Sequence, residues 1–162
     1  MRVYLAATIP LLAQLERDGR FEPAEGYAVT PSLREWYPEG DEEELEYAAL
    51  TAAARGSLRL LAGRPDAARR RVVVAADVPD TRVAVPGGPG QEPGVIGITG
   101  AVRLADVASL HVDEATAESA VTSAIGALAA AEEGDPGALA AVEAAEDHDL
   151  LWYGTQELRD LV

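Results

Sequence analysis

The segment Val72–Ala76, with the sequence VVVAA, constrains the fold more than any other part of the chain. Five consecutive apolar residues with no polar alternation are typical of a strand that is buried on both faces. Such a strand needs a layer of structure on each side. We therefore expect residues 72–78 to form a central strand, and Pro79-Asp80 to turn the chain toward a weaker strand at 82–85.

A long helix is expected over about residues 41–62. Asp41 is a suitable N-cap, Glu44 follows at the spacing of a capping box, and Glu42 and Glu43 fill the first turn, where the helix dipole favours negative charge. Two apolar stripes lie on nearly opposite sides of this helix: Tyr47, Leu50, Ala54, Leu58 and Leu61 on one, and Leu45, Ala49, Ala52, Gly56 and Leu60 on the other. A helix that is apolar on two sides is expected to pack on both and to lie in the interior.

The remaining elements follow from shorter patterns. Thr8, Thr30 and Asp113 are predicted N-caps, opening helices that run to about residue 18, through Tyr37 and to about Ala131. Further strands are expected at 2–7, 27–29, 94–102, 107–112 and 149–153, a further short helix after 134–136, and a flexible loop at 86–94.

Together these elements predict one α/β domain over residues 1–162, in which a mixed sheet carries flanking helices and right-handed crossovers join its parallel strands. Residues 72–78 with 82–85 are expected to form one hairpin, and residues 95–112 another. An α+β arrangement is the alternative.

The composition excludes several functional classes. The chain has 28 acidic residues against 13 basic ones and a formal charge of −15, which argues against nucleic acid or an anionic membrane as a partner. All 13 bases are Arg; with no Lys and no Cys, the chain has no Schiff-base lysine, thiol nucleophile, disulfide or cysteine-bound metal. No transmembrane segment, signal peptide or cofactor motif is found, so we expect a cytoplasmic protein without a cofactor.

Polar residues at the ends of the predicted strands are the candidates for catalysis or ligand binding. In α/β sheets, ligands bind beyond the carboxyl ends of the strands, and of the polar residues found there only Asp77 is not already explained as a helix cap. A cleft lined by Asp77, Asp113, His111 and His148 would suit an enzyme or a small-ligand binder. His111, Asp113 and His148 are also the only candidates for a divalent metal, but their spacing matches no metal motif, so no metal site is expected.

The aromatic residues point to a different function. Two Trp-Tyr pairs, Trp36-Tyr37 and Trp152-Tyr153, contain four of the eight aromatic residues. Acids lie close to each pair, such as Glu35 beside the first and Asp149 near the second. An acidic surface that displays aromatic rings suits a basic or Arg-rich protein partner, through charge attraction and cation–π contacts. The alternative is that the two pairs fill the ends of an alanine-rich core.

The segments around these residues also resemble a known family. The sequences AVTPSLREWYPEGDEEELEYAAL, RRRVVVAADVPD, LHVDEA and AEDHDLLWYGTQEL are together similar to a small family of uncharacterised actinobacterial proteins. The resemblance extends over most of the chain and implies an origin but no activity, cofactor or catalytic residue.

Of these two functions, the sequence favours a non-enzymatic one: an acidic interaction or regulatory module that binds a protein partner and can also self-associate. The candidate binding residues are Glu35, Trp36, Tyr37, Asp77, His148, Trp152 and Tyr153. The alternative is the enzyme or small-ligand binder with its cleft at the strand ends.

Overall fold

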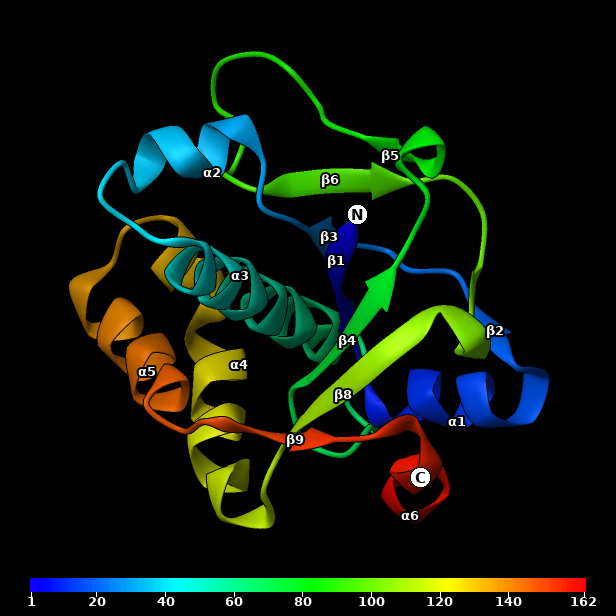
Figure 1. Cartoon of the computed structure of the whole chain (residues 1–162). Coiled ribbons are helices and arrows are strands. Elements are labelled where there is room, and N and C mark those ends of the chain that lie inside the picture. The colour runs from blue at the N-terminus through cyan, green and yellow to red at the C-terminus, as the bar shows by residue number, and fades with distance from the viewer.

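The apolar segment predicted to be central forms β4 (Val72–Asp77), an interior strand of a seven-stranded sheet. The computed structural model describes residues 1–162 (Figure 1). The sheet has the order β5-β6-β3-β1-β4-β8-β9. Its other strands are β1 (Arg2–Ala7), β3 (Gly26–Tyr27), β5 (Val83–Ala84), β6 (Val95–Ile98), β8 (Val107–Asp113) and β9 (Leu150–Tyr153).

The predicted class, a sheet with flanking helices in a layered α/β arrangement, is confirmed. The pairing within the sheet differs from the prediction, because each pair of neighbouring strands is antiparallel and no parallel crossover occurs. Neither predicted hairpin forms: β4 lies between β1 and β8, and β5 pairs with β6. A second, two-stranded sheet pairs β2 (Arg20–Phe21) with β7 (Val102–Arg103).

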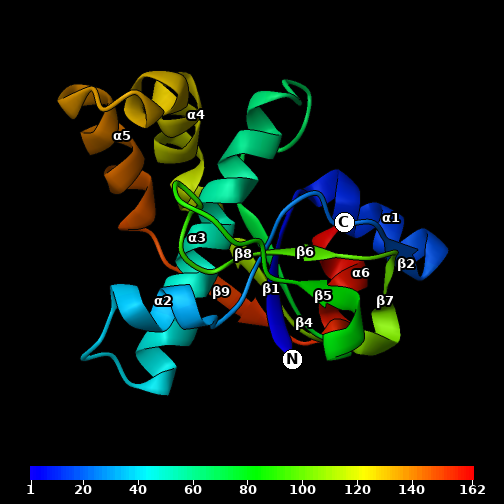
Figure 2. The same cartoon turned by 90° about the horizontal axis from the view of Figure 1, so that it is seen from above.

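Helices cover both faces of the sheet, as the apolar β4 requires (Figure 2). One face carries α2 (Pro31–Trp36) and α3 (Glu42–Ala62), with α4 (Glu118–Glu132) and α5 (Pro136–Glu146) packed beyond α3. The opposite face carries α1 (Ile9–Asp18), α6 (Leu158–Leu161) and the β2–β7 pair. Alternate residues of β4 therefore enter different cores, with Val72 and Val74 beneath α1 and Val73 beneath α3.

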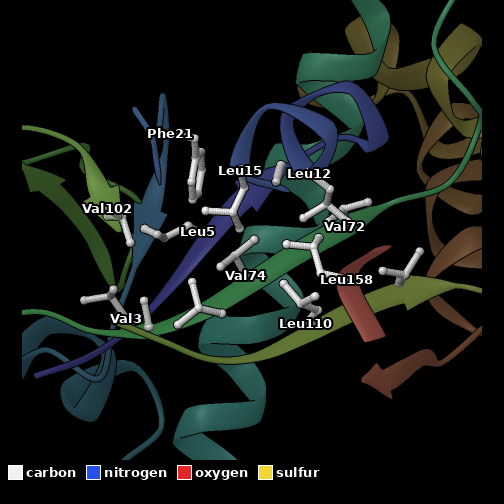
Figure 3. Packing of buried hydrophobic residues seen from close by; sticks show 14 of the residues in the cluster. Val3, Leu5, Leu12, Leu15, Phe21, Val72, Val74, Val102, Leu110 and Leu158 are labelled. Atoms are coloured by element: carbon white, nitrogen blue, oxygen red, sulfur yellow. The ribbon is translucent and has the colours of Figure 1, made fainter. Parts of the chain in front are cut away.

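The core beneath α1 and α6 is the largest and is built from aliphatic side chains and one aromatic ring (Figure 3). Leu5 and Val74 rise from the sheet, Leu12 and Leu15 descend from α1, and Phe21 closes one end. The face beneath α3 is built largely from alanines and two tyrosines, Tyr4 and Tyr27. Small side chains bring α3 close to the sheet: a Cβ added at Gly56 would lie 3.0 Å from the Cβ of Ala6.

The predicted starts of three helices are confirmed. Thr8, Thr30 and Asp41 each accept a hydrogen bond from the backbone N–H three residues on, and Asp41 and Glu44 form the reciprocal capping box. Asp113 does not cap a helix. It is the last residue of β8, and a short 3₁₀ turn (Ala115–Ala117) separates it from α4.

The prediction for α3 holds for its second half and is wrong for its first. Ser57, Leu58 and Leu61 are buried, and the Ser57 hydroxyl donates to the carbonyl of Ala7 (2.7 Å) and accepts from the N–H of Val72 (3.0 Å). Tyr47, placed by the sequence on a buried stripe, is 60% exposed. The first half of α3 thus packs on one side only.

None of the helices combines the length and the hydrophobicity that are needed to span a membrane.

Candidate functional site

The uncovered side of α3 forms the floor of two adjoining hollows. The first, of about 800 Å³, lies between this side of α3 and the turn after α2, and the second, of about 460 Å³, continues toward β9. Tyr47, Thr51 and Glu146 line both hollows, which makes them one continuous groove. We call it the aromatic groove. The first hollow is lined by Trp36, Tyr37, Pro38, Glu39, Gly40, Glu44, Tyr47, Ala48, Thr51, Ala52, Arg55, Glu92 and Glu146.

Three aromatic side chains line the first hollow and are open to solvent: Trp36 is 67% exposed, Tyr37 47% and Tyr47 60%. The local sequence holds them there. Helix α2 ends at Trp36, and Tyr37 is its C-cap, directly before Pro38 in the turn that leads to α3. Tyr47 reaches the hollow from the second turn of α3. Large exposed rings in a concave surface are typical of binding sites.

The charges around these rings are mainly negative. Glu39, Glu44, Glu92 and Glu146 line the first hollow, against one cation, Arg55. Arg55 is already paired, because its Nε donates to Glu146 at 2.8 Å. One carboxylate oxygen of Glu44 accepts the hydrogen bond of the capping box, from the N–H of Asp41. Glu39 is exposed and has no ion-pair partner. A cationic group entering the groove would therefore meet unneutralised carboxylate beside aromatic faces.

One wall of the groove is fixed by a network around Arg59. This guanidinium donates to Glu132 (2.7 Å), to Glu25 and to the Tyr27 hydroxyl (3.2 Å), and lies 3.6 Å from Glu92. The Tyr27 hydroxyl lies 2.8 Å from Glu92. Burial and the carboxylates of Glu25 and Glu92 raise the pKa of Tyr27, and bonds to Glu132 and Tyr27 raise the pKa of Arg59 despite its partial burial. The network thereby ties the 86–94 loop, through Glu92, to α3.

The second hollow holds both histidines but no metal-binding cluster. His111 from β8 and His148, which follows α5, line it together with Asp149 and Leu150. His111 Nε2 lies 2.9 Å from the Ser109 hydroxyl. Nowhere in the chain do three His, Asp or Glu side chains gather as metal ligands would. The weak metal candidates His111, Asp113 and His148 are thus not assembled into one site.

The state of His111 gives a prediction on stability against pH. Burial, and to a lesser extent the charge of Arg2, lower the pKa of His111 below its ordinary value of 6.5. The folded protein therefore holds this imidazole neutral, while the unfolded chain takes up a proton as the pH falls below about 6.5. The contribution of His111 to the free energy of unfolding is therefore fully present above that pH. It decreases as the pH falls, by no more than about 1.4 kcal/mol per pH unit.

The variant His111→Gln should remove this contribution. Urea unfolding at pH 8 and pH 5.5 is expected to show a smaller loss of stability on acidification for the variant than for the unmodified chain. Equal losses in the two proteins would contradict the assigned neutral state.

The predicted cleft at the strand ends does not form, because the sheet is antiparallel. Asp77 ends β4 and Asp113 ends β8, and since Val72 pairs with Val112 these two ends lie at opposite margins of the sheet, roughly 20 Å apart. Each aspartate instead pairs with an arginine at the neighbouring strand's start: Arg2, the first residue of β1, or Arg71, the residue directly before β4. Arg2 bonds Asp77 at the exposed margin, with an Nε–Oδ1 distance of 2.8 Å, and this bond lowers the pKa of Asp77.

Asp113 makes the corresponding pair in the interior. Arg71 Nε and Nη2 donate to the two carboxylate oxygens at 2.8 and 2.7 Å, and the Arg71 backbone N–H donates a third bond at 2.8 Å. The side chains are 3% and 0% exposed. Asp113 is therefore a structural ion-pair partner of Arg71, and its carboxylate is occupied.

Of the predicted binding residues, the structure brings Trp36, Tyr37 and His148 to the aromatic groove. Glu35 is exposed on α2 beside it but does not line it. Asp77, Trp152 and Tyr153 lie outside both hollows. Trp152 is 63% exposed, and Tyr153 packs partly into the core beneath α6, so the Trp-Tyr pair on β9 splits between the two faces of the sheet.

The sequence did not identify Tyr47 and Arg55 as groove residues. Both lie on α3, where the helical pattern assigned Tyr47 to a buried stripe. The available signal was its neighbours: Glu43, Glu44 and Glu46 surround Tyr47 with charge in the first turns of the helix.

Comparison with known proteins identifies the family but no activity. The chain belongs to DUF6912, a family of unknown function, which it matches over residues 1–162. No curated protein and no solved structure matches it.

Proposed function

We propose that this member of the DUF6912 family is a non-enzymatic interaction module that binds a basic, arginine-bearing segment of a partner protein in the aromatic groove. The observation that carries the proposal is the meeting of three exposed aromatic rings with an excess of carboxylates around one hollow of about 800 Å³. The net charge of −15 would steer a basic partner toward the protein. We place this activity in the cytoplasm, in keeping with the absence of cysteine.

The chemistry of the groove favours arginine over other side chains. The planar guanidinium of arginine can stack on an aromatic face and at the same time donate hydrogen bonds to a carboxylate in its own plane. The ammonium of lysine is a compact point charge, which pairs with a carboxylate but has no plane to stack. Trp36, Tyr37 and Tyr47 supply the faces, and Glu39 supplies an exposed, unpaired carboxylate. A tetra-arginine peptide should therefore bind more tightly than a tetra-lysine peptide.

The test is titration calorimetry with a tetra-arginine peptide at low salt. Trp36→Ala and Tyr47→Ala are each expected to weaken binding about two- to fivefold, the range of a cation–π contact at an exposed site, and raising the salt should weaken it further. Val85→Ala, which removes an exposed apolar side chain away from both hollows, is the matched control.

A second pair of variants tests the charge contribution. Glu39→Gln should weaken binding of the tetra-arginine peptide, while Glu133→Gln, which also removes an exposed carboxylate but lies outside the groove, should not. The proposal fails if the peptide does not bind, or if Trp36→Ala binds it as the unmodified chain does. Affinity purification from native cytosol should recover proteins with basic segments; a retained small molecule alone would instead favour a ligand-binding function.

A further inference from the structure

Strand β9 is an edge of the main sheet, and its outer side is not covered by another strand. Figure 1 shows it as the outermost strand, between α5 and α6. The sequence LLWY contains no charged residue and no proline, which are the usual means of blocking an edge. The opposite edge, β5, is only two residues long, and Pro86 lies two residues beyond its end.

The hydrogen-bond pattern shows which backbone groups of β9 face outward. The Asp113 N–H donates to the Arg71 carbonyl, so Asp113 points its backbone toward β4. By alternation along the strand, Leu110 and Val112 point theirs toward β9, where they pair with Tyr153 and Leu151. The N–H and C=O groups of Leu150 and Trp152 therefore face away from the sheet. The next outward N–H, that of Gly154, donates to Glu157 at 2.8 Å and ends the open edge.

The side chains of this edge are also exposed. Trp152 and Leu151 are 63% and 40% exposed and project to opposite faces of the sheet, because Trp152 pairs with His111 and Leu151 with Val112. An added strand would thus find free backbone groups between two apolar side chains, the arrangement used when an extended peptide joins a sheet edge.

The charge beside this edge selects the occupant. Asp147 and Asp149 are exposed directly before β9, and the whole chain carries −15, so a second copy would bring like charges together. A basic segment would be attracted to the same place. From the Asp149 end of β9 the second hollow leads to Glu146 and on to Tyr47.

We propose that β9 accepts an extended segment of the partner as an additional, antiparallel strand, with basic residues following that strand in the partner's sequence. An antiparallel strand would run from the Tyr153 end of β9 toward Leu150, so the residues after it would emerge at Asp149 and enter the aromatic groove. This inference rests on the proposed function for the chemistry of the partner, and adds the way in which the partner binds and the order of its segments.

The test compares two synthetic peptides of identical composition. In one, three valines alternating with threonines precede four arginines; in the other, the four arginines come first. The first peptide should bind the unmodified chain at least about fivefold more tightly than the second, through the added backbone bonds. Equal affinities, with tetra-arginine still bound at the groove, would overturn strand addition and leave the proposed function standing.

Two variants at one position test the backbone contribution. Trp152→Pro removes the outward N–H, at a position where it is not used by the sheet, whereas Trp152→Val removes the ring but keeps the N–H. The preference between the two peptides should disappear in Trp152→Pro and persist in Trp152→Val. If the preference for the first peptide persisted in both variants, the proposal would be overturned. It would also be overturned if the chain alone formed a dimer that dissociates in Trp152→Pro, because a second copy would then be the occupant of β9.

Hydrogen exchange on the unmodified chain provides a measurement that does not depend on a variant folding. The amides of Leu150 and Trp152 should exchange quickly in the free protein and become protected on adding the first peptide, while that of Leu151, bonded to β8, should be protected in both. Unchanged exchange at Leu150 and Trp152 under saturating peptide would rule out strand addition.

Discussion

Asp113→Ala is expected to lower the free energy of unfolding by about 3–5 kcal/mol, the range for removing one partner of a buried ion pair. The substitution leaves the Arg71 guanidinium almost fully buried without its carboxylate, and it also removes the acceptor of the Arg71 backbone N–H. The bond from Arg71 to the His148 carbonyl remains but does not neutralise the charge. Since domains of this size are stable by about 5–15 kcal/mol, the loss is a large share of the total. Urea unfolding followed by circular dichroism measures it.

Two further variants separate the charge from the packing. Asp113→Asn keeps the shape and some hydrogen bonds and should cost less than Asp113→Ala. The double variant Arg71→Met with Asp113→Leu removes both charges and should be more stable than Asp113→Ala, because no uncompensated charge stays buried. A loss below about 1 kcal/mol in Asp113→Ala would contradict the structural role assigned to this pair.

The same residue shows where sequence patterns stop being informative. Asp113 precedes an alanine-rich helix, the ordinary position for an N-cap, and nothing within the local sequence distinguishes it from Thr8, Thr30 or Asp41, which are caps. What differs is a residue 42 positions away. Arg71 lies opposite Asp113 where β4 and β8 are neighbours, and its guanidinium donates hydrogen bonds to both carboxylate oxygens. A contact so distant in sequence is fixed by the sheet register, which local periodicity does not encode.

Strand pairing was missed for a related reason. The central position of residues 72–76 could be predicted because burial on both faces is written into the segment itself. The identity of the neighbouring strand is not encoded in the segment itself. The expectation that β4 pairs with the next strand in the sequence was therefore wrong. In the fold, β1 and β8 have six and seven residues against two for β5, so they form longer ladders with β4, and their residues are mostly buried, whereas those of β5 are not.

The candidate site was predictable in part. Clustered aromatics beside acids drew attention to Trp36 and Tyr37, and the structure places both in the groove. Tyr47 was missed because the helical pattern treats every apolar stripe as covered. Coverage depends on where neighbouring helices end, and α4 and α5 pack mainly against the second half of α3 around Leu58 and Leu61.

Phe21→Ala should also be strongly destabilising, by about 3–5 kcal/mol, the usual cost of truncating a buried phenylalanine. Phe21 is the only phenylalanine in the chain and is 1% exposed, opposite Val102 in the β2–β7 pair and in the same buried cluster as Leu5 and Leu15 (Figure 3). A two-residue strand is too short to give a periodic signal, so this position was not apparent from the sequence. Phe21→Leu leaves a smaller cavity and should cost clearly less; an equal cost in both variants would contradict a packing origin.

Phe21→Ala also separates stability from binding. Phe21 packs beneath α1, on the face of the sheet opposite to α3 and the aromatic groove. At a temperature and urea concentration where the variant is fully folded, its affinity for tetra-arginine should match that of the unmodified chain, whereas Trp36→Ala should lose affinity while keeping its stability. Because Trp36 is two-thirds exposed, its truncation leaves no cavity. If Phe21→Ala weakened peptide binding as much as Trp36→Ala does, the effect of Trp36→Ala would be explained by destabilisation of the fold. That result would contradict the assignment of the aromatic groove as the binding surface.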